Sequence, residues 1–369
     1  MLQNMQTEPI FKKVPVGIIT WHYYPNFGSS LQAYALHSFI NRHGGDASLI
    51  NYVEGNRPEF WRLRLLLGRI DAVVPRFIAS KLHYRFLLFE KQYFRETKII
   101  RTRDGLEEQN CRFSKFICGS DQIWAPNVFN DVYFLSFVKD NAKKYSYAAS
   151  IGLPRIPDGL INKYKVLLDD FNMISVREYQ AQSYLKDTFG IDSELVLDPT
   201  LLITSRQWRE IAISPKTSDY LLCYFLGQNE GHRKIASEIA KSLGLKIICL
   251  SRFDVDKNHK DFIVDSDAGP REFIGYVNNA NIVITDSFHG LCFSVNFCRQ
   301  FYVLPRFSEK DPINQNSRIF NLLSIFGLED RLINNMPDNF RNINFETVQD
   351  KLEIMRKKSI TFLESIINK

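Results

Sequence analysis

Hydrophobic and polar positions along the chain alternate in a way that predicts repeated β-α units. Residues 16–20 form a short apolar run, and residues 30–40 follow with apolar positions spaced for one face of a helix. A second short apolar run, residues 47–52, comes after the helix-stopping pair Gly44 and Gly45. Strands that alternate with helices are typical of parallel sheets covered by helices. The chain is therefore predicted to open with a β-α-β unit.

The same alternation continues along the chain and predicts two α/β domains. Further strands are expected at residues 113–118, 144–149, 171–176, 195–197, 220–226, 245–250 and 281–285. A weakly patterned stretch at 204–219 reads as a linker, and 369 residues are more than one hydrophobic core usually organises. We predict a Rossmann-like domain in residues 1–204, a second in 205–344, and a helix over 345–369 that packs back across the boundary.

A polar turn interrupts the apolar sequence between the strand at 281–285 and the helix that follows it. The turn contains Asp286, Ser287, Phe288, His289 and Gly290. In open α/β sheets the carboxyl ends of the strands are where ligands bind. An imidazole at His289 can donate a proton or stabilise a leaving phosphate, with Asp286 orienting it. The alternative is a histidine satisfied in the core and an aspartate that caps the next helix.

The turn after the first strand is the second candidate for ligand binding. Asn26, Gly28, Ser29 and Gln32 lie where the first helix begins, and backbone N–H groups at a helix N-terminus bind anions or hydroxyl oxygens. The alternative is an ordinary turn in which Ser29 or Ser30 caps the helix.

A third polar turn follows the strand at 113–118 and has a composition suited to carbohydrate. Ser120, Asp121, Gln122 and Trp124 combine a carboxylate, an amide and an indole, which bind sugar hydroxyls and stack on sugar rings. Asp121 is also a candidate base for a hydroxyl nucleophile. The alternative is a plain turn with a buried tryptophan.

Two later strands end in further candidates. Ser150 lies in the turn after residues 144–149, and Arg177 ends the strand at 171–176. A guanidinium there can hold a carboxylate or phosphate through two hydrogen bonds. Equally, Arg177 can pair with Glu178 or Asp198 in a structural network.

The formal charge of +6 is concentrated in one segment, residues 61–103, which holds 11 Lys and Arg against three Asp and Glu among apolar residues. One interpretation is docking at an anionic membrane surface, and the other is a helical insertion whose apolar side belongs to the core. No apolar run approaches the ~20 residues that span a bilayer, so a cytoplasmic protein is expected, peripheral at the membrane under the first interpretation. No C-x-x-C pair, metal-ligand cluster or nucleic-acid-binding motif stands out.

Six blocks taken in order resemble the polysaccharide pyruvyl transferase family. They are residues 26–36, 119–124, 149–152, 175–178, 198–200 and 285–290. The resemblance implies a glycosyltransferase-B-like pair of Rossmann-like domains facing across a cleft. It also implies a reaction in which the pyruvyl group of phosphoenolpyruvate moves onto a sugar as a ketal and phosphate is released. The acceptor would be a capsule or other surface-polysaccharide precursor, often linked to a polyprenyl pyrophosphate.

The resemblance implies roles for the candidate residues. The N-terminal domain would bind the acceptor and the C-terminal domain phosphoenolpyruvate, with no cofactor or metal. We expect His289 as general acid or phosphate stabiliser, Arg177 as the anion clamp, and Asp121 as base or sugar ligand. Relatives carry Arg-Leu-His where this chain has Ser287, Phe288 and His289, so one cation is missing. Arg252, Arg271 and Arg306 are the expected substitutes.

Two other functions remain open from the sequence. A glycosyltransferase that uses a nucleotide sugar is compatible with two Rossmann-like domains, because a fold alone does not set a function. A glycan-binding relative without activity is compatible with the serine at position 287.

Overall fold

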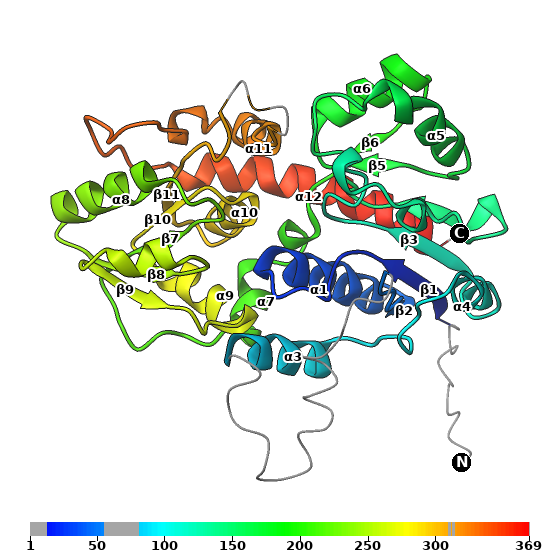
Figure 1. Ribbon diagram of the computed structural model, residues 1–369, viewed down its shortest axis with the longest axis horizontal. Helices are drawn as coiled ribbons and strands as arrows, with labels where there is room; N and C mark the ends of the chain where they lie inside the picture. Colours follow the sequence, from blue (N-terminus) through cyan, green and yellow to red (C-terminus); the bar gives the residue numbers. More distant parts are fainter. Residues whose placement is uncertain (1–12, 55–80, 309–310, 312–313, 369) are drawn as a thin grey trace, which may run out of the picture.

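The computed structural model describes residues 13–54, 81–308, 311 and 314–368, and shows two parallel sheets covered by helices (Figure 1). This confirms the α/β fold with two Rossmann-like domains. Short 3-10 helices lie at Glu108–Cys111, Pro126–Val128, Asp131–Phe134, Asn141–Lys143, Pro199–Leu201, Asp254–Asn258 and Glu329–Arg331.

The sheet of the N-terminal domain has the strand order β2-β1-β3-β4. Its strands are β1 (Val14–Ile19), β2 (Gly45–Leu49), β3 (Lys115–Cys118) and β4 (Lys144–Ser146), and single bridges lead on to β5 (Ser175–Val176) and β6 (Glu194–Leu195). Its helices are α1 (Phe27–Arg42), α3 (Lys81–Tyr93), α4 (Arg103–Glu107), α5 (Asp158–Asp169) and α6 (Tyr179–Phe189). The chain leaves β1 toward β2 and leaves β3 toward β4, so the connections diverge between β1 and β3.

The sheet of the C-terminal domain has the order β11-β10-β7-β8-β9, again all parallel. Its strands are β7 (Tyr220–Tyr224), β8 (Lys246–Leu250), β9 (Phe262–Asp265), β10 (Ile282–Thr285) and β11 (Gln300–Val303). Its helices are α7 (Ser205–Ile211), α8 (Glu230–Leu243), α9 (Pro270–Asn279), α10 (Phe288–Asn296) and α11 (Ser317–Phe326). The first strand, β7, is central, as in dinucleotide-binding sheets.

Aromatic side chains hold the two domains together. Phe27 at the start of α1 stacks on Phe86 of α3, with ring centroids 5.4 Å apart, and on Phe273 of α9, at 4.7 Å. All three rings are almost completely buried and belong to one hydrophobic cluster that includes both domains. The interface therefore continues the core, and burying each ring favours the closed arrangement by a few kcal/mol, about 1.5–3 on the usual scale.

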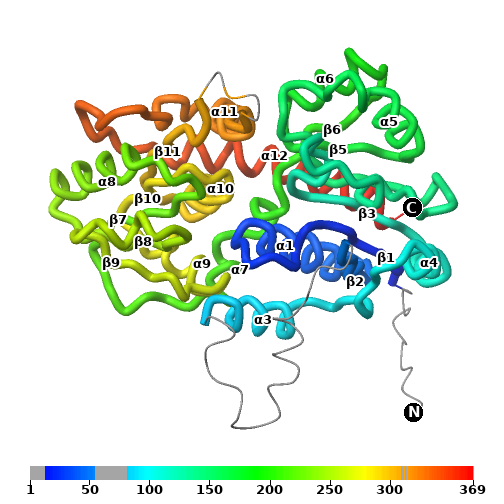
Figure 2. Tube along the Cα trace, in the orientation of Figure 1, coloured from blue at the N-terminus to red at the C-terminus, as the bar shows by residue number. Residues whose placement is uncertain are grey.

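The last helix, α12 (Phe345–Ile367), runs behind both domains (Figure 2). Leu352 packs in the cluster that includes both domains, whereas Leu363 packs in a cluster with β1. Ser359 accepts a hydrogen bond from the Leu197 backbone N–H at 2.9 Å. The helix thus packs back across the boundary.

Two expectations are modified by the structure. The expected linker contains α7, whose N-terminus is fixed by a capping box between Thr204 and Gln207. Of the basic segment, residues 61–80 lie outside the described residues. The described part forms α3, whose Arg85 pairs with Glu272 of α9 while Phe86 and Phe89 enter the core. This helix therefore agrees with the interpretation of the segment as a helical insertion whose apolar side belongs to the core. Among the described residues, no helix is both long and apolar enough to cross a membrane.

Candidate functional site

A cleft of about 460 Å³ lies between the domains at the carboxyl ends of both sheets. The first domain lines it with the loops that follow β1 and β3, and the second with those that follow β7, β8 and β10. Connections diverge between β1 and β3 and between β7 and β10, and such switch points are where open α/β sheets bind ligands. The two switch points therefore face one another across one site.

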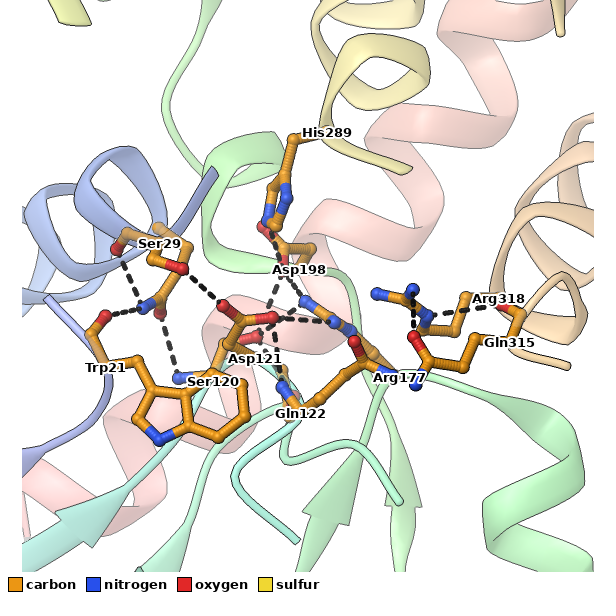
Figure 3. A network of polar contacts seen from close by, with 12 residues as sticks. Trp21, Ser29, Ser120, Asp121, Gln122, Arg177, Asp198, His289, Gln315 and Arg318 are labelled. Atoms are coloured by element: carbon orange, nitrogen blue, oxygen red, sulfur yellow. Dashed lines mark hydrogen bonds and ion pairs between the residues drawn. The ribbon is translucent and has the colours of Figure 1, made fainter. Parts of the chain in front are cut away.

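Arg177 lies at the centre of a buried ionic cluster beside this cleft (Figure 3). Its guanidinium donates to Asp198 at 2.6 Å, to Asp121 at 3.3 Å and to Glu178 at 3.3 Å. The side chain is 1% exposed. Burial alone would lower the pKa of Arg177, but the three carboxylates outweigh burial and raise it.

The expected anion clamp is therefore corrected. Nε, Nη1 and Nη2 of Arg177 each donate to a protein carboxylate, Nη1 also donates to the Ser120 hydroxyl at 3.2 Å, and the centroid of the Phe288 ring lies 4.5 Å from the guanidinium carbon. Because the side chain is 1% exposed, a substrate anion does not reach it in this arrangement. The contacts of Arg177 match the alternative interpretation, in which it pairs with Glu178 and Asp198 in a structural network.

Asp121 is held as a carboxylate that faces the cleft. Oδ2 accepts a hydrogen bond from the Ser29 hydroxyl at 2.8 Å, and its backbone has a φ of 74°. Burial would raise the pKa of Asp121, but Arg177, His289 and the Ser29 hydroxyl lower it below its usual value. A left-handed backbone at a residue other than glycine is uncommon and gathers at functional sites. The loop after β3 therefore fixes an ionised acceptor at the cleft wall.

His289 begins α10 and faces Asp198 across the domain boundary. Its Nε2 lies 3.7 Å from Oδ2 of Asp198, beyond hydrogen-bond distance. Gly28 of α1 lies against the opposite side of the ring, where a Cβ would overlap Nδ1. Residues of both domains therefore position the imidazole.

The expected role of Asp286 is corrected. Its Oδ1 accepts from the Leu226 backbone N–H at 2.6 Å and its Oδ2 from Gly227 at 2.9 Å, so it orders the loop after β7 and does not orient His289. Burial raises the pKa of Asp286. A carboxylate near His289 is that of Asp198, which the sequence indicated as a strand-end residue and a possible partner of Arg177, not as a partner of this histidine.

Three arginines of the C-terminal domain line the cleft, and among the described residues none has a carboxylate within 4 Å of its guanidinium. They are Arg252, Arg306 and Arg318. Burial and the neighbouring Arg177 lower the pKa of Arg318 to about 9, and burial lowers that of Arg306. Positive charges desolvated without a counter-ion make an anion-binding wall.

The sequence named two of these arginines and missed the third. Arg318 lies on α11, whose apolar residues Ile319, Leu322, Leu323 and Phe326 have helical spacing that predicts a helix there. Nothing in that pattern indicates that its N-terminus faces a cleft. Arg271, also expected, is elsewhere: its Nε donates to the Ile211 carbonyl at 2.8 Å.

Several predicted residues support the cleft without lining it. Gln32 is buried, donates to the Trp21 carbonyl at 3.1 Å and accepts from the Ser120 backbone N–H at 3.1 Å. The Ser120 hydroxyl donates to Asp198 at 3.0 Å. Ser150 is completely buried beside Glu178. These side chains fix the positions of the loops and are not exposed to a ligand.

The expected stacking role of Trp124 is wrong. Its indole is 0% exposed, donates to the Tyr133 carbonyl at 3.1 Å and stacks on Phe134. The plain-turn alternative holds for this residue, because its apolar ring fills the core under the β3 loop. Trp21, in the loop after β1, lines the cleft instead.

The remaining candidates lie at the cleft or directly behind it. Asn26, Ser29, Gln122, Ser287 and Phe288 all line the cleft. Asn26 and Ser287 also cap helices, α1 and α10, through hydrogen bonds from Ser29 N–H at 3.2 Å and Gly290 N–H at 3.3 Å. Asn26 and Ser287 therefore each cap a helix and line the cleft. Among the described residues, no group of three or more His, Cys, Asp or Glu could hold a metal ion.

Comparisons with known proteins show the family through one family model and the fold through solved structures. The family model for polysaccharide pyruvyl transferases matches residues 26–306. A putative UDP-N-acetylglucosamine 2-epimerase from Listeria monocytogenes has a similar structure, with 10% identity over 96% of this chain and 91% of that chain and a TM-score of 0.52. UDP-N-acetylglucosamine 2-epimerase from Rickettsia bellii is similar at 10% identity over 97% and 98%, with a TM-score of 0.50. At this identity the similarity shows the fold, a glycosyltransferase-B-like arrangement. A search of curated proteins finds no match.

Proposed function

Because the chain belongs to the polysaccharide pyruvyl transferase family, we propose that it transfers the pyruvyl group of phosphoenolpyruvate onto a sugar of a surface-polysaccharide precursor. The product is a pyruvate ketal and the second product is phosphate. The donor lies against the C-terminal wall of the cleft, and the acceptor against the N-terminal wall.

The observation that carries the proposal is the set of arginines on the C-terminal wall. Arg252, Arg306 and Arg318 bring positive charge to the cleft without carboxylate partners among the described residues. Phosphoenolpyruvate carries a phosphate and a carboxylate, and guanidinium groups bind both through paired, charge-assisted hydrogen bonds. The charges of this donor match those of this wall.

The serine at position 287 does not leave the site without a cation. Ser287 caps α10, and the guanidinium of Arg318 lies over the neighbouring Phe288 ring, 5.8 Å from its centroid. Arg318 therefore supplies, from α11, a charge that relatives place at the start of α10. This supports an active enzyme in spite of the substitution.

His289 and Asp121 have positions that suit the two proton transfers of the first step. In that step a proton reaches the methylene carbon of the enol phosphate, and a sugar hydroxyl adds to the adjacent carbon while it loses its own proton. A second hydroxyl of the same sugar then displaces phosphate and closes the ketal, and the proton of that hydroxyl leaves with the phosphate. We assign His289 as the acid that serves the donor, and Asp121 as the acceptor of the hydroxyl proton. Arg177 is a positioning residue that holds Asp121 and Asp198.

The test is release of phosphate from phosphoenolpyruvate that depends on a lipid-linked glycan precursor, together with mass spectrometry of the glycan. A mass gain of pyruvate minus water is expected. His289→Ala should lose this activity, and His259→Ala, whose ring is outside the cleft beside Glu230, should keep it. Acceptor-dependent release of a nucleotide from a sugar nucleotide, or glycan binding without turnover of either donor, would contradict the proposal.

The proposal extends to where the acceptor is held. A polyprenyl-pyrophosphate-linked precursor lies at the inner face of the membrane, and the sequence of residues 61–80, in which arginines alternate with apolar residues, is suited to that surface. Charge reversal at Arg62, Arg64 and Arg69 should abolish binding to anionic liposomes while phosphate release with a water-soluble acceptor persists. If the charge-reversed variant binds liposomes as tightly as the wild type, these arginines do not dock the enzyme at the membrane.

A further inference from the structure

We propose that the loop after β1 forms a stacking subsite for the ring of an uncharged sugar, with Trp21 as its platform. The inference rests on the proposed function only for the chemical class of the acceptor. Trp21, Tyr23, Tyr24 and Tyr133 all line the N-terminal side of the cleft. Trp21 and Tyr24 are the exposed members of this group, and the buried rings of Tyr23 and Tyr133 support them from behind.

Trp21 differs from the buried tryptophans in its surroundings. Trp124 and Trp208 are 0% exposed, whereas Trp21 is partly exposed and faces the cleft. Its backbone is fixed by the hydrogen bond from Gln32, and its ring meets Tyr133 edge-on, at 6.3 Å and 89°. Part of the indole packs against the core of the N-terminal domain, and the part that stays exposed at the cleft wall is a preformed stacking surface.

The second half of the wall is the pair Tyr23 and Tyr24. Their rings lie 4.4 Å apart at 38°, and Tyr24 is 40% exposed. Tyr23 is buried and holds the exposed ring of Tyr24 in place beside the cleft. Tyrosine hydroxyls at the rim provide donors and acceptors for sugar hydroxyls.

The two walls of the cleft carry opposite charges, and this restricts the kind of sugar ring that can bind on the N-terminal wall. The N-terminal wall contributes the carboxylates of Asp121 and Glu54, and no lysine or arginine of the described N-terminal domain lines it. The three arginines all come from the C-terminal domain. Figure 3 shows Trp21 and Arg318 on opposite sides of Asp121. A uronic acid on Trp21 would bring its carboxylate beside two others, whereas a neutral ring would not.

The arrangement also sets the direction of transfer. A ring stacked on Trp21 presents its edge toward Asp121, which accepts from Ser29 and faces the donor side. Stacking therefore selects the ring, and Asp121 selects the hydroxyl.

Calorimetric titration of the full chain with methyl glycosides tests the subsite without any donor. The panel is methyl glucoside, galactoside, mannoside and N-acetylglucosaminide, with methyl glucuronide as the charged comparison. Stacking of this kind is worth ~1 kcal/mol, so Trp21→Ala should weaken binding of a neutral glycoside by about five- to tenfold, and Trp21→Phe should restore most of it. Tyr84→Ala, an exposed tyrosine on α3 outside the cleft, is the matched control and should bind normally.

Binding of phosphoenolpyruvate, measured in parallel, separates this inference from the proposed function. It should be unchanged in Trp21→Ala, which also shows that the variant is folded. Unaltered glycoside binding in Trp21→Ala, glucuronide bound as tightly as the neutral rings, or no saturable binding of any neutral glycoside would each overturn the subsite. Loss of glycoside binding in Trp21→Ala in a protein that never turns over phosphoenolpyruvate would support the subsite and contradict the proposed function.

Discussion

Gly28 and His289 are in direct contact, although they come from different domains and are separated by most of the chain. A Cβ at position 28 would overlap Nδ1 and its neighbouring atoms in the imidazole ring. The start of α1 thus serves as a wall for the side chain at the start of α10. Glycine is required here for close approach.

Gly28→Ala should move His289 away from its place beside Asp198 and reduce turnover by about a hundredfold, in the range expected for losing an acid or base. The matched control is Gly159→Ala in α5, where an added Cβ would meet nothing within 4 Å. Phosphate release in both variants is the measurement. Equal activity in the two would show that contact with position 28 does not position the imidazole.

Arg177→Gln should destabilise the protein strongly. Removing the guanidinium leaves Asp198, Asp121 and Glu178 buried together without their shared cation, and breaking a buried pair in this way costs about 3–5 kcal/mol. Chemical denaturation measures the loss in free energy of unfolding. A variant as stable as the wild type that fails only to bind phosphoenolpyruvate would restore the anion-clamp interpretation.

Arg318→Gln should weaken binding of phosphoenolpyruvate without destabilising the protein, in contrast to Arg177→Gln. The wild-type guanidinium is buried with hydrogen bonds to Gln315 and no described carboxylate within 4 Å, so its removal relieves unpaired charge and should leave stability within about 1 kcal/mol of wild type. Binding of phosphoenolpyruvate should weaken by at least about tenfold, because hydrogen bonds to charged groups contribute about 1.5–3 kcal/mol. Calorimetry and denaturation on the same preparation give both quantities. A destabilised variant with normal binding would exclude Arg318 from the anion wall.

Stability should fall as pH is lowered from 7.5 to 4.5 because of two buried histidines. Burial lowers the pKa of His37 to about 4, and burial and the neighbouring Arg233 lower that of His232 to about 4. The unfolded chain binds these protons near pH 6.5 and the folded protein only near pH 4. Their contribution, about 3 kcal/mol each, is therefore complete above pH 6.5 and is lost as pH falls toward 4.

The double variant His37→Gln, His232→Gln tests this assignment. Its free energy of unfolding, from urea denaturation at pH 7.5 and 4.5, should change less between the two conditions than that of the wild type. An identical decrease in both proteins would place the pH dependence in other groups.

The loops that follow strands could be found from the sequence, because buried strands and polar turns have opposite composition. Asp121, Ser287 and His289 were located in this way, and all three line the cleft. What a strand-end residue contacts depends on the other domain. Arg177 and Asp198 both end strands, yet their charges neutralise each other, and no local pattern distinguishes such a pair from a ligand site.

Two tryptophans show that a local sequence pattern also fails to predict which side chain is buried. Trp21 and Trp124 both follow strands of one sheet, within two positions of a polar residue. Only the path of the following loop decides which indole enters the core and which faces the cleft. Arg318 was missed for a related reason, because α11 comes to the cleft through packing between domains.

The position of α12 has a consequence for how the protein is made. Phe362, Leu363 and Ile366 complete the cluster around Val16 and Ile18 of the first strand, so the N-terminal domain is closed by residues translated long after its sheet. At ordinary elongation rates this delay is on the order of ten seconds. During that time a newly synthesised first domain exposes the apolar surface that α12 will cover, and such surface is prone to aggregation.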